Sequence, residues 1–342
     1  MVITELGWDA QREAEWQGNP LSEAGAFPGR VVRVERTVVH VALEDAVCVV
    51  PASGCAVGDW VATDGSTWVS VLPRRTELSR HSADRTSEEQ VLAANVDAVF
   101  VVEPAYPQPH HRRIERMLTL AWASGARPIV LLTKSDLVDH DVVTEVESVT
   151  RGVEVISVSS ETGHHLDVLA GLISPGDTFI LLGPSGAGKS SLVNALAGAP
   201  VLATGEVRGD GRGRHTTTRR ELITIEGLGS LIDTPGLRSV GMTAQEAGLE
   251  ATFDDIASLA AQCRFSDCAH ATEPGCAVQR AVDELALDPR RLDNYHRIER
   301  EIAHQARRKN AYSRVDERRD TKSRRAAKRV VMEAKGRADG SS

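Results

Sequence analysis

The sequence predicts a multidomain protein. We expect an N-terminal OB-like β-barrel, a central α/β domain built around a phosphate-binding loop, and a C-terminal helical domain that carries a cysteine and histidine cluster. Short valine-rich segments with turns between them occupy residues 30–73, apolar runs alternate with helical patterns from residue 96, and three of the five cysteines gather at 263–276. With 342 residues, the chain is long enough for about two or three domains.

The first 76 residues divide into an extension and a barrel. Residues 1–29 are polar and turn-rich, and we expect this N-terminal extension to be poorly ordered at its start. The stretch RVVRVERTVVHVAL (30–43) alternates apolar and polar residues, and further short segments follow, so we place an OB-like β-barrel at 30–76. A β-domain of another kind, without a ligand, fits the same pattern. The charged segment 74–90 is interpreted as a linker.

The central domain is assigned to residues 77–240. Its runs VDAVFVV and PIVLLT are continuously apolar, as expected of parallel strands that are buried on both faces. Between them, HRRIERMLTLAWASG places Ile114, Leu118 and Trp122 on one face of a helix. Strand and helix patterns continue to alternate as far as SLIDT, and this alternation predicts an α/β fold.

A glycine-rich loop, GPSGAGKSS, lies between an apolar strand and a helix. Its glycines allow a tight turn whose N–H groups can surround phosphate oxygens, and the start of the helix favours the same anion. Lys189 is predicted to reach the β and γ phosphates, and Ser190 to place its hydroxyl on Mg²⁺. The predicted nucleotide contacts of this loop are Gly183, Pro184, Ser185, Gly186, Ala187, Gly188, Lys189, Ser190 and Ser191.

Two later segments complete a site for a nucleoside triphosphate. In LIDTPG, Asp233 follows a strand and can hold Mg²⁺ through water, and the Gly236 amide can contact the γ phosphate. The glycine- and arginine-rich stretch 205–221 is predicted to be a switch loop, one threonine of which completes the Mg²⁺ shell. The candidates are Thr216, Thr217 and Thr218. An ordinary strand-end turn and a plain flexible loop are the alternatives.

The base of the nucleotide is predicted to be guanine. The segment TKSD ends the strand PIVLLT, so it lies at the carboxyl edge of the sheet, where ligands bind. Asp136 can accept hydrogen bonds from guanine N1–H and the exocyclic amine, and Lys134 can lay its stem along the base. The predicted contacts are Thr133, Lys134, Ser135 and Asp136, with a supporting pair at Ser159 and Ser160. These motifs precede the phosphate loop, so the usual GTPase order is rotated, as a circular permutation would produce.

The cysteine cluster CRFSDCAHATEPGC has the spacing C-x4-C-x-H-x5-C. Three thiolates and one imidazole make a closed tetrahedral shell for one Zn²⁺, with no position left open for water. The predicted ligands are Cys263, Cys268, His270 and Cys276. We therefore expect a structural zinc site in a helical domain at 241–305; buried free cysteines are the alternative.

Taken together, QVLAANVDAVFVV, GPSGAGKSSLVN, GRHTTT, IDTPG and the Cys/His cluster resemble the RsgA (YjeQ) family of small ribosomal subunit biogenesis GTPases. The resemblance covers roughly residues 30–305. It implies an OB fold, a circularly permuted P-loop GTPase domain and a zinc domain. It also implies GTP hydrolysis that the 30S subunit stimulates during late maturation of that subunit. Thr133 stands where the family more often has Asn, and Ser160 where it has Ala.

The residue that positions the attacking water is not the usual glutamine. Leu237 follows Gly236, and a leucine cannot orient water, so we expect slow intrinsic turnover. His215 is the nearest candidate, because imidazole can orient or deprotonate a water. A histidine that contacts phosphate or RNA is the alternative.

Charge is distributed unevenly along the chain. Thirteen Lys and Arg against four Asp and Glu in 307–337 leave the rest at −17, for an overall −8. A basic tail at 306–342 on an acidic body suggests contact with a polyanion, and the resemblance implies that this polyanion is 16S rRNA of the 30S subunit; a solvated tail is the alternative. We expect no signal peptide and no membrane span, and therefore a cytoplasmic protein. We also expect a monomer. A GTPase that regulates a protein partner, or an RNA-binding module with a structural nucleotide site, remain other possible functions.

Overall fold

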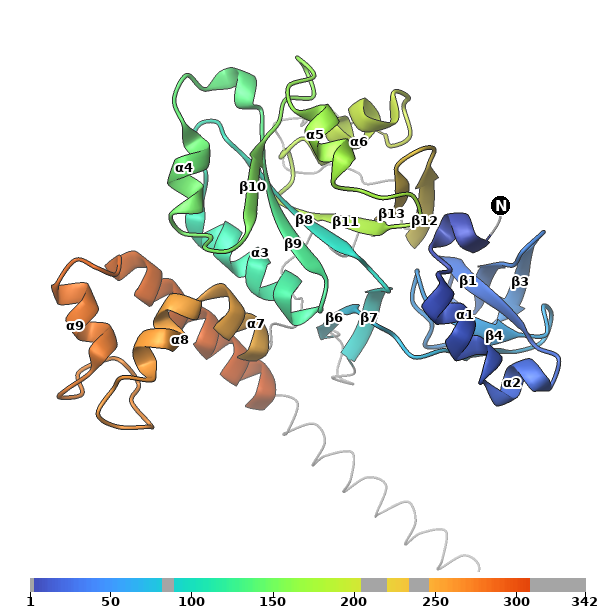
Figure 1. Ribbon diagram of the computed structural model, residues 1–342, viewed down its shortest axis with the longest axis horizontal. Helices are drawn as coiled ribbons and strands as arrows, with labels where there is room; N and C mark the ends of the chain where they lie inside the picture. The colour runs from blue at the N-terminus through green and yellow to red at the C-terminus, as the bar shows by residue number, and fades with distance from the viewer. Residues whose placement is uncertain (1–2, 82–88, 204–219, 234–245, 308–342) are drawn as a thin grey trace, which may run out of the picture.

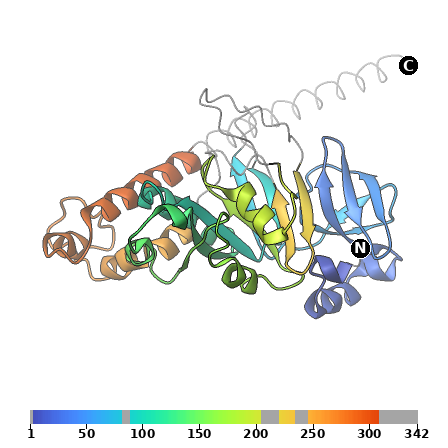
Figure 2. The same ribbon diagram turned by 90° about the horizontal axis from the view of Figure 1, so that it is seen from above.

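The computed structural model describes residues 3–81, 89–203, 220–233 and 246–307. These residues form three parts arranged along the long axis of the molecule: a β-barrel with the N-terminal helices, a central α/β domain, and a helical module near the C-terminus (Figure 2). The side chains of 80, 81 and 89 are not described. Within the described residues, no helix is both long and apolar enough to cross a membrane.

The barrel is built from five strands. They are β1 (Phe27–Val34), β2 (Val38–Ala42), β3 (Val47–Pro51), β4 (Trp60–Thr63) and β5 (Val69–Val71). All pairs are antiparallel: β1 pairs with both β2 and β4, β2 also pairs with β3, and β4 also pairs with β5. Alternate valines point inward and form a small core of their own, as the period-two pattern predicts. The strands are consistent with the expected OB fold.

The N-terminal extension differs from our expectation of a poorly ordered, polar start. Within it, residues 3–23 form η1 (Ile3–Leu6), α1 (Ala10–Gln17) and α2 (Pro20–Glu23). The indole of Trp8 packs edge-on against Trp60 of the barrel, at 4.9 Å between ring centroids, and against Trp16 at 6.5 Å. Because burial of these indoles requires the barrel as a partner, the local polar pattern did not reveal these helices.

The central domain is a mixed sheet covered on both faces. Its strands, in sheet order, are β10 (Glu154–Ser157), β9 (Arg127–Thr133), β8 (Ala98–Pro104), β11 (Thr178–Leu182), β13 (Gly229–Asp233) and β12 (Arg220–Ile225). All pairs are parallel except that of β12 with β13. Side chains of α3 (His111–Ala123) and α4 (Val142–Glu147) share one core with the sheet. Those of α5 (Leu166–Gly171) and α6 (Lys189–Ala197) share the other (Figure 1).

Two features of the strand pairing were not expected. The segment interpreted as a linker contains β6 (Glu77–His81) and the first two residues of β7 (Glu89–Ala94), and these strands pair antiparallel as a separate two-stranded sheet around the buried Leu78 and Leu92. In addition, β1 of the barrel pairs with β12, so that Arg33 lies opposite Glu221 and one sheet runs through both domains. A single buried leucine among charged residues hides the first strand, and cross-domain pairing leaves no local signal.

The C-terminal module is helical, as expected. It contains α7 (Glu246–Thr252), α8 (Asp254–Ala260), α9 (Ala277–Asp283) and a longer helix at residues 289–307, which we call the C-terminal helix. Phe253, Ile256 and Ile298 are buried in its core. α7 lies directly on α3. At Gly248 the two helices are so close that an added Cβ would stand 2.2 Å from the Thr119 carbonyl oxygen. The module is therefore packed tightly against the central domain.

Candidate nucleotide and metal sites

The phosphate loop joins β11 to α6 at the carboxyl edge of the sheet. Gly183 lies against β8, where a Cβ would stand 2.3 Å from the Val102 carbonyl oxygen, and Gly188 has a left-handed φ of 86°. The ammonium of Lys189 donates to the carbonyls of Gly183 at 2.8 Å and Pro184 at 2.7 Å. The lysine is thus held across the loop, beside the N-terminus of α6. This is the arrangement of backbone and ammonium that suits a bound phosphate chain.

The guanine motif lies at the end of the next strand but one. Lys134 adopts a left-handed conformation with φ 59°, which turns the chain from β9 into η2 (Ser135–Leu137). Asp136 in this turn accepts a hydrogen bond at its Oδ1 from the Ser159 hydroxyl, at 2.6 Å. No other hydrogen bond to the Asp136 carboxylate comes from the described residues, so Oδ2 can accept from a base.

Ser159 is more than the backbone support that we expected. Its side chain is fully buried, and its oxygen accepts from the amides of Glu161 and Thr162, both at 3.2 Å, while its proton goes to Asp136. The carboxylate is therefore fixed by the segment that follows β10. The sequence could have indicated this contact, because serine side chains often bind the backbone amides that follow them in a turn.

Thr133 links the two motifs. Its hydroxyl donates to the Ala187 carbonyl in the phosphate loop at 2.6 Å, and the side chain is buried. The hydroxyl of Thr133 therefore contacts the phosphate loop at the position where the family more often has Asn. The predicted guanine motif and the predicted phosphate loop are therefore joined through one short hydrogen bond.

The remaining predicted residues of this site are placed only in part. Asp233 ends β13, which lies next to β11, and Ser190 lies in the first turn of α6. Both are at the same edge of the sheet as the phosphate loop, as a shared Mg²⁺ would require. Ser160 follows the buried Ser159 directly. Gly236, His215 and the three threonines Thr216, Thr217 and Thr218 lie outside the described residues.

The cysteine and histidine cluster is assembled in three dimensions. The donor atoms of Cys263, Cys268, His270 and Cys276 all lie within 4.8 Å of one another. The Cys263 and Cys276 sulfurs are 3.8 Å apart, and each is 3.6 Å from His270 Nδ1. Tetrahedral zinc with bonds of about 2.3 Å to sulfur and about 2.0–2.1 Å to nitrogen requires about 3.8 Å between two sulfurs and about 3.5–3.6 Å between sulfur and nitrogen. The residues therefore fit a tetrahedral metal ion.

Backbone and side-chain contacts hold this cluster in place. The Cys263 sulfur accepts from the Ala277 amide at 3.3 Å, and the Cys276 sulfur accepts from the Gln279 amide at 3.4 Å. The Gln279 side chain also donates to the His270 carbonyl at 2.5 Å. Amide donors of this kind stabilise thiolate charge and orient the ligands. Sequence spacing identified the ligands, whereas Gln279 was missed because a helical glutamine carries no particular signal.

Comparison with known proteins identifies the family to which this chain belongs. The family model described as RsgA GTPase matches residues 71–243, which include the guanine motif and the phosphate loop. The chain is 45% identical to the small ribosomal subunit biogenesis GTPase RsgA of Streptomyces avermitilis, over 97% of this chain and 94% of that protein. This chain belongs to the RsgA GTPase family. It is accordingly a GTP hydrolase with the motifs of its domain in circularly permuted order.

Further relatives agree with membership in the RsgA family. The RsgA of Xanthomonas axonopodis pv. citri is 39% identical, over 88% of this chain and 89% of that protein. YjeQ from Thermotoga maritima has a similar structure, with a TM-score of 0.61 and 27% identity over 81% of this chain and 99% of that one. The circularly permuted GTPase YloQ gives 0.58 and 26%, over 82% of this chain and 96% of that one.

A second family model, described as ABC transporter, matches residues 166–326. That stretch contains the phosphate loop, which many nucleotide-binding proteins share. The guanine motif at Thr133–Asp136 lies outside it and inside the RsgA match. The base-reading residues therefore favour the RsgA assignment over the transporter one.

Proposed function

We propose that this RsgA-family GTPase assists late maturation of the small ribosomal subunit, and that contact with the subunit stimulates its GTP hydrolysis. The observation that carries the proposal is full-length similarity to relatives named small ribosomal subunit biogenesis GTPase, combined with a guanine motif tied to the phosphate loop through Thr133. GTP would hold the protein on the subunit, and hydrolysis would release it.

The nucleotide site would act mainly by positioning. Asp136, held by Ser159, would accept from guanine, and Lys134 would cover the base. Lys189 and the loop amides would bind the β and γ phosphates and offset the charge that develops on transfer. Ser190 and Asp233 would hold Mg²⁺, which stabilises phosphate charge when bound. The remaining predicted loop contacts are Pro184, Ser185, Ser191 and the Gly236 amide.

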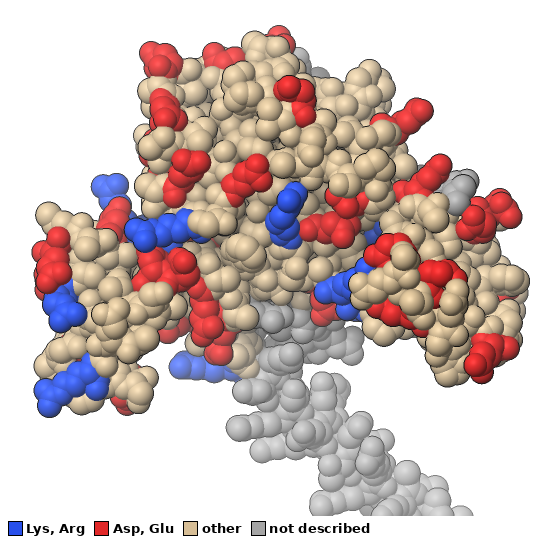
Figure 3. All heavy atoms as spheres, in the orientation of Figure 1, with Lys and Arg blue, Asp and Glu red and all other residues tan. Residues whose placement is uncertain are grey.

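RNA binding is proposed for the tail and the metal module. The face seen in Figure 3 carries acidic side chains over all three parts, with basic ones scattered among them. The described residues on this face offer no broad cationic platform, whereas residues 307–337 carry thirteen Lys and Arg. On the module, Arg264 lies 5.4 Å from the ring centroid of the exposed Phe265, a pair on which an RNA base can stack.

We propose that the metal is one structural Zn²⁺ and that the protein is a cytoplasmic monomer.

The test is turnover of GTP and of ATP, with and without purified 30S subunits. We expect slow hydrolysis of GTP alone, no comparable hydrolysis of ATP, and stimulation by 30S that weakens as salt is raised, because phosphate contacts release counterions. Absence of stimulation would favour a GTPase with a protein partner. Binding of GTP with no turnover under either condition would favour a structural nucleotide site.

His215 is proposed as the residue that orients the water once the subunit is bound. In the same assay, His215→Ala should bind GTP normally and lose most of the stimulated turnover. If the stimulated rate of this variant equals that of the unmodified protein, His215 does not have this role.

A further inference from the structure

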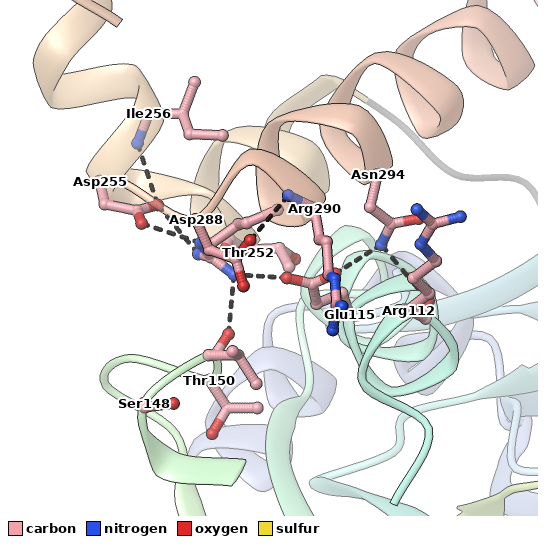
Figure 4. Close-up of polar contacts among 12 residues, drawn as sticks. Arg112, Glu115, Ser148, Thr150, Thr252, Asp255, Ile256, Asp288, Arg290 and Asn294 are labelled. Atoms are coloured by element: carbon pink, nitrogen blue, oxygen red, sulfur yellow. Dashed lines mark hydrogen bonds and ion pairs between the residues drawn. The ribbon is translucent and has the colours of Figure 1, made fainter. Parts of the chain in front are cut away.

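A buried arginine joins the metal module to the central domain. Arg291, near the start of the C-terminal helix, is only 5% exposed. In Figure 4, Glu115 of α3, Asp255 of α8 and Asn294 of the C-terminal helix converge on one place from three elements. The Arg291 guanidinium carbon lies 4.7 Å from the centroid of the Phe253 ring. We call this set the Arg291 junction, meaning Arg291, Asn294, Glu115 and Asp255.

Every N–H of the guanidinium has an acceptor. Nε and Nη2 donate to the two oxygens of Asp255 at 2.8 and 2.9 Å, and Nη2 also reaches the Thr252 carbonyl at 2.9 Å. Nη1 donates to Glu115 Oε1 and to the Val149 carbonyl, both at 2.7 Å. Three of these five hydrogen bonds lie within the module, and the two from Nη1 join it to α3 and to the loop before β10. Only the planar, five-donor fork of arginine can make them together.

The charges at this junction depend on one another. Burial raises the pKa of Glu115 despite its partner. Burial also acts to raise the pKa of Asp255, but the hydrogen bonds and charge of Arg291 outweigh it, so that pKa is lowered. Arg291 has a raised pKa, because its two carboxylate partners overcome the effect of burial. Separation of the module from α3 would leave buried charges without their partners, which is costly, so the junction favours one relative position of the module and α3.

The contacts extend along the first turns of α3. Asn294 holds the other oxygen of Glu115 at 2.6 Å, so both carboxylate oxygens are bound by the C-terminal helix. Arg112 pairs with Asp293 at 2.7 Å, and Arg116 pairs with Glu301 at 2.7 Å. The C-terminal helix is thus fastened to α3 by ion pairs on both sides of Glu115.

From α3 the contacts continue to the nucleotide edge. Arg113 holds the fully buried Glu103 at the end of β8, with Nε 2.8 Å from Oε2. Glu103 also accepts from the His110 amide at 3.1 Å, which fixes the loop between β8 and α3. The end of β8 pairs with Thr133, whose hydroxyl bonds Ala187 of the phosphate loop. A shift of α3 is therefore transmitted to the strand end that supports the phosphate loop.

We propose that Arg291 is a positioning residue through which docking of the metal module controls hydrolysis at the nucleotide site. The proposal rests on the proposed function, because it needs a partner that binds the module. Docking would displace the C-terminal helix, the Arg291 junction would carry that displacement to α3, and Glu103 would carry it to the phosphate loop. Arg291 touches neither nucleotide nor Mg²⁺, so intrinsic turnover does not depend on it directly.

The experiment compares Arg291→Lys with the unmodified full-length protein. Lysine keeps the charge but has three donors, so it cannot bind Glu115, Asp255 and both carbonyls at once. We expect the variant to keep one bound zinc. Its KM for GTP and its intrinsic kcat should stay within about two-fold of those of the unmodified protein. Its 30S-stimulated kcat should fall roughly ten-fold, a typical size for coupling between sites. Binding to 30S in the presence of a non-hydrolysable GTP analogue should be retained.

Matched variants make the result decisive. Arg297→Lys changes an exposed arginine on the same helix and should be stimulated normally. Glu115→Gln and Asn294→Ala weaken the same junction while keeping the guanidinium, and each should lose part of the stimulation. Normal stimulation of all three junction variants overturns the proposal. Lack of stimulation in the unmodified protein instead overturns the proposed function, so the two failures are distinguishable.

Discussion

Asp136→Asn should convert this GTPase into an enzyme that prefers xanthosine triphosphate. Ser159 donates to Asp136 Oδ1, and an asparagine can keep this bond with its own Oδ1, so the turn should remain in place. The oxygen available to the base is then replaced by an amide that faces two guanine donors. Affinity for GTP should fall roughly 100-fold or more, because hydrogen bonds to charged groups contribute about 1.5–3 kcal/mol each.

Competition binding with GTP, ATP and xanthosine triphosphate measures this change. Xanthine presents a carbonyl where guanine has its amine, so the new amide can donate to it and affinity should be regained. Asp139→Asn is the matched control, because Asp139 is fully exposed three residues further on and should leave preference unchanged. If Asp136→Asn binds GTP as tightly as before, TKSD does not read the base.

Removal of the metal should unfold the C-terminal module. Cys276→Ser should abolish stoichiometric zinc, because Cys276 is a buried donor 3.8 Å from Cys263 and 3.6 Å from His270. The cysteines also pack into the core around Phe253 and Ile298. Binding energy of structural zinc is folding energy, about 10–16 kcal/mol in isolated zinc fingers at neutral pH, so its loss should destabilise this small core severely.

Metal analysis, thermal unfolding and limited proteolysis measure the effect. We expect early melting and cleavage within residues 246–307, with GDP binding retained, because the residues predicted to contact the nucleotide belong to other elements. Cys48→Ser, at a half-buried barrel cysteine, should keep one zinc and unfold normally. A metal-free protein with an intact module would show that these cysteines are ordinary buried thiols.

The two sites were foreseeable because each chemical motif is short. GPSGAGKSS places its predicted ligand-binding groups within nine residues, and TKSD within four. The strand before each motif fixes its position at one edge of the sheet. The cluster from Cys263 to Cys276 spans fourteen residues, so spacing alone restricts the metal geometry. Residue types with few alternative uses therefore carried the assignment.

The buried charged residues that connect the nucleotide edge to the C-terminal module could not be predicted from the sequence in this way. Glu103 looks like a charged residue at a strand end, yet it is fully buried by Arg113 and the His110 amide. Arg291 belongs to a charged helical pattern, yet its partners Glu115 and Val149 lie 176 and 142 residues away. Single charged residues are compatible with many environments, and only the folded chain selects one.

Short stretches of the amino-acid sequence are enough to predict guanine recognition, phosphate binding, a four-ligand metal cluster and the permuted order of the motifs. Each of these predictions depends on groups that are close along the chain or follow a buried strand. The way in which the parts are joined is visible only in the folded chain. Trp8 packs on Trp60, β1 pairs with β12, and Arg291 fastens the metal module to α3. These contacts arise from burial and pairing between distant segments, whose free energy exists only once both segments have been brought together.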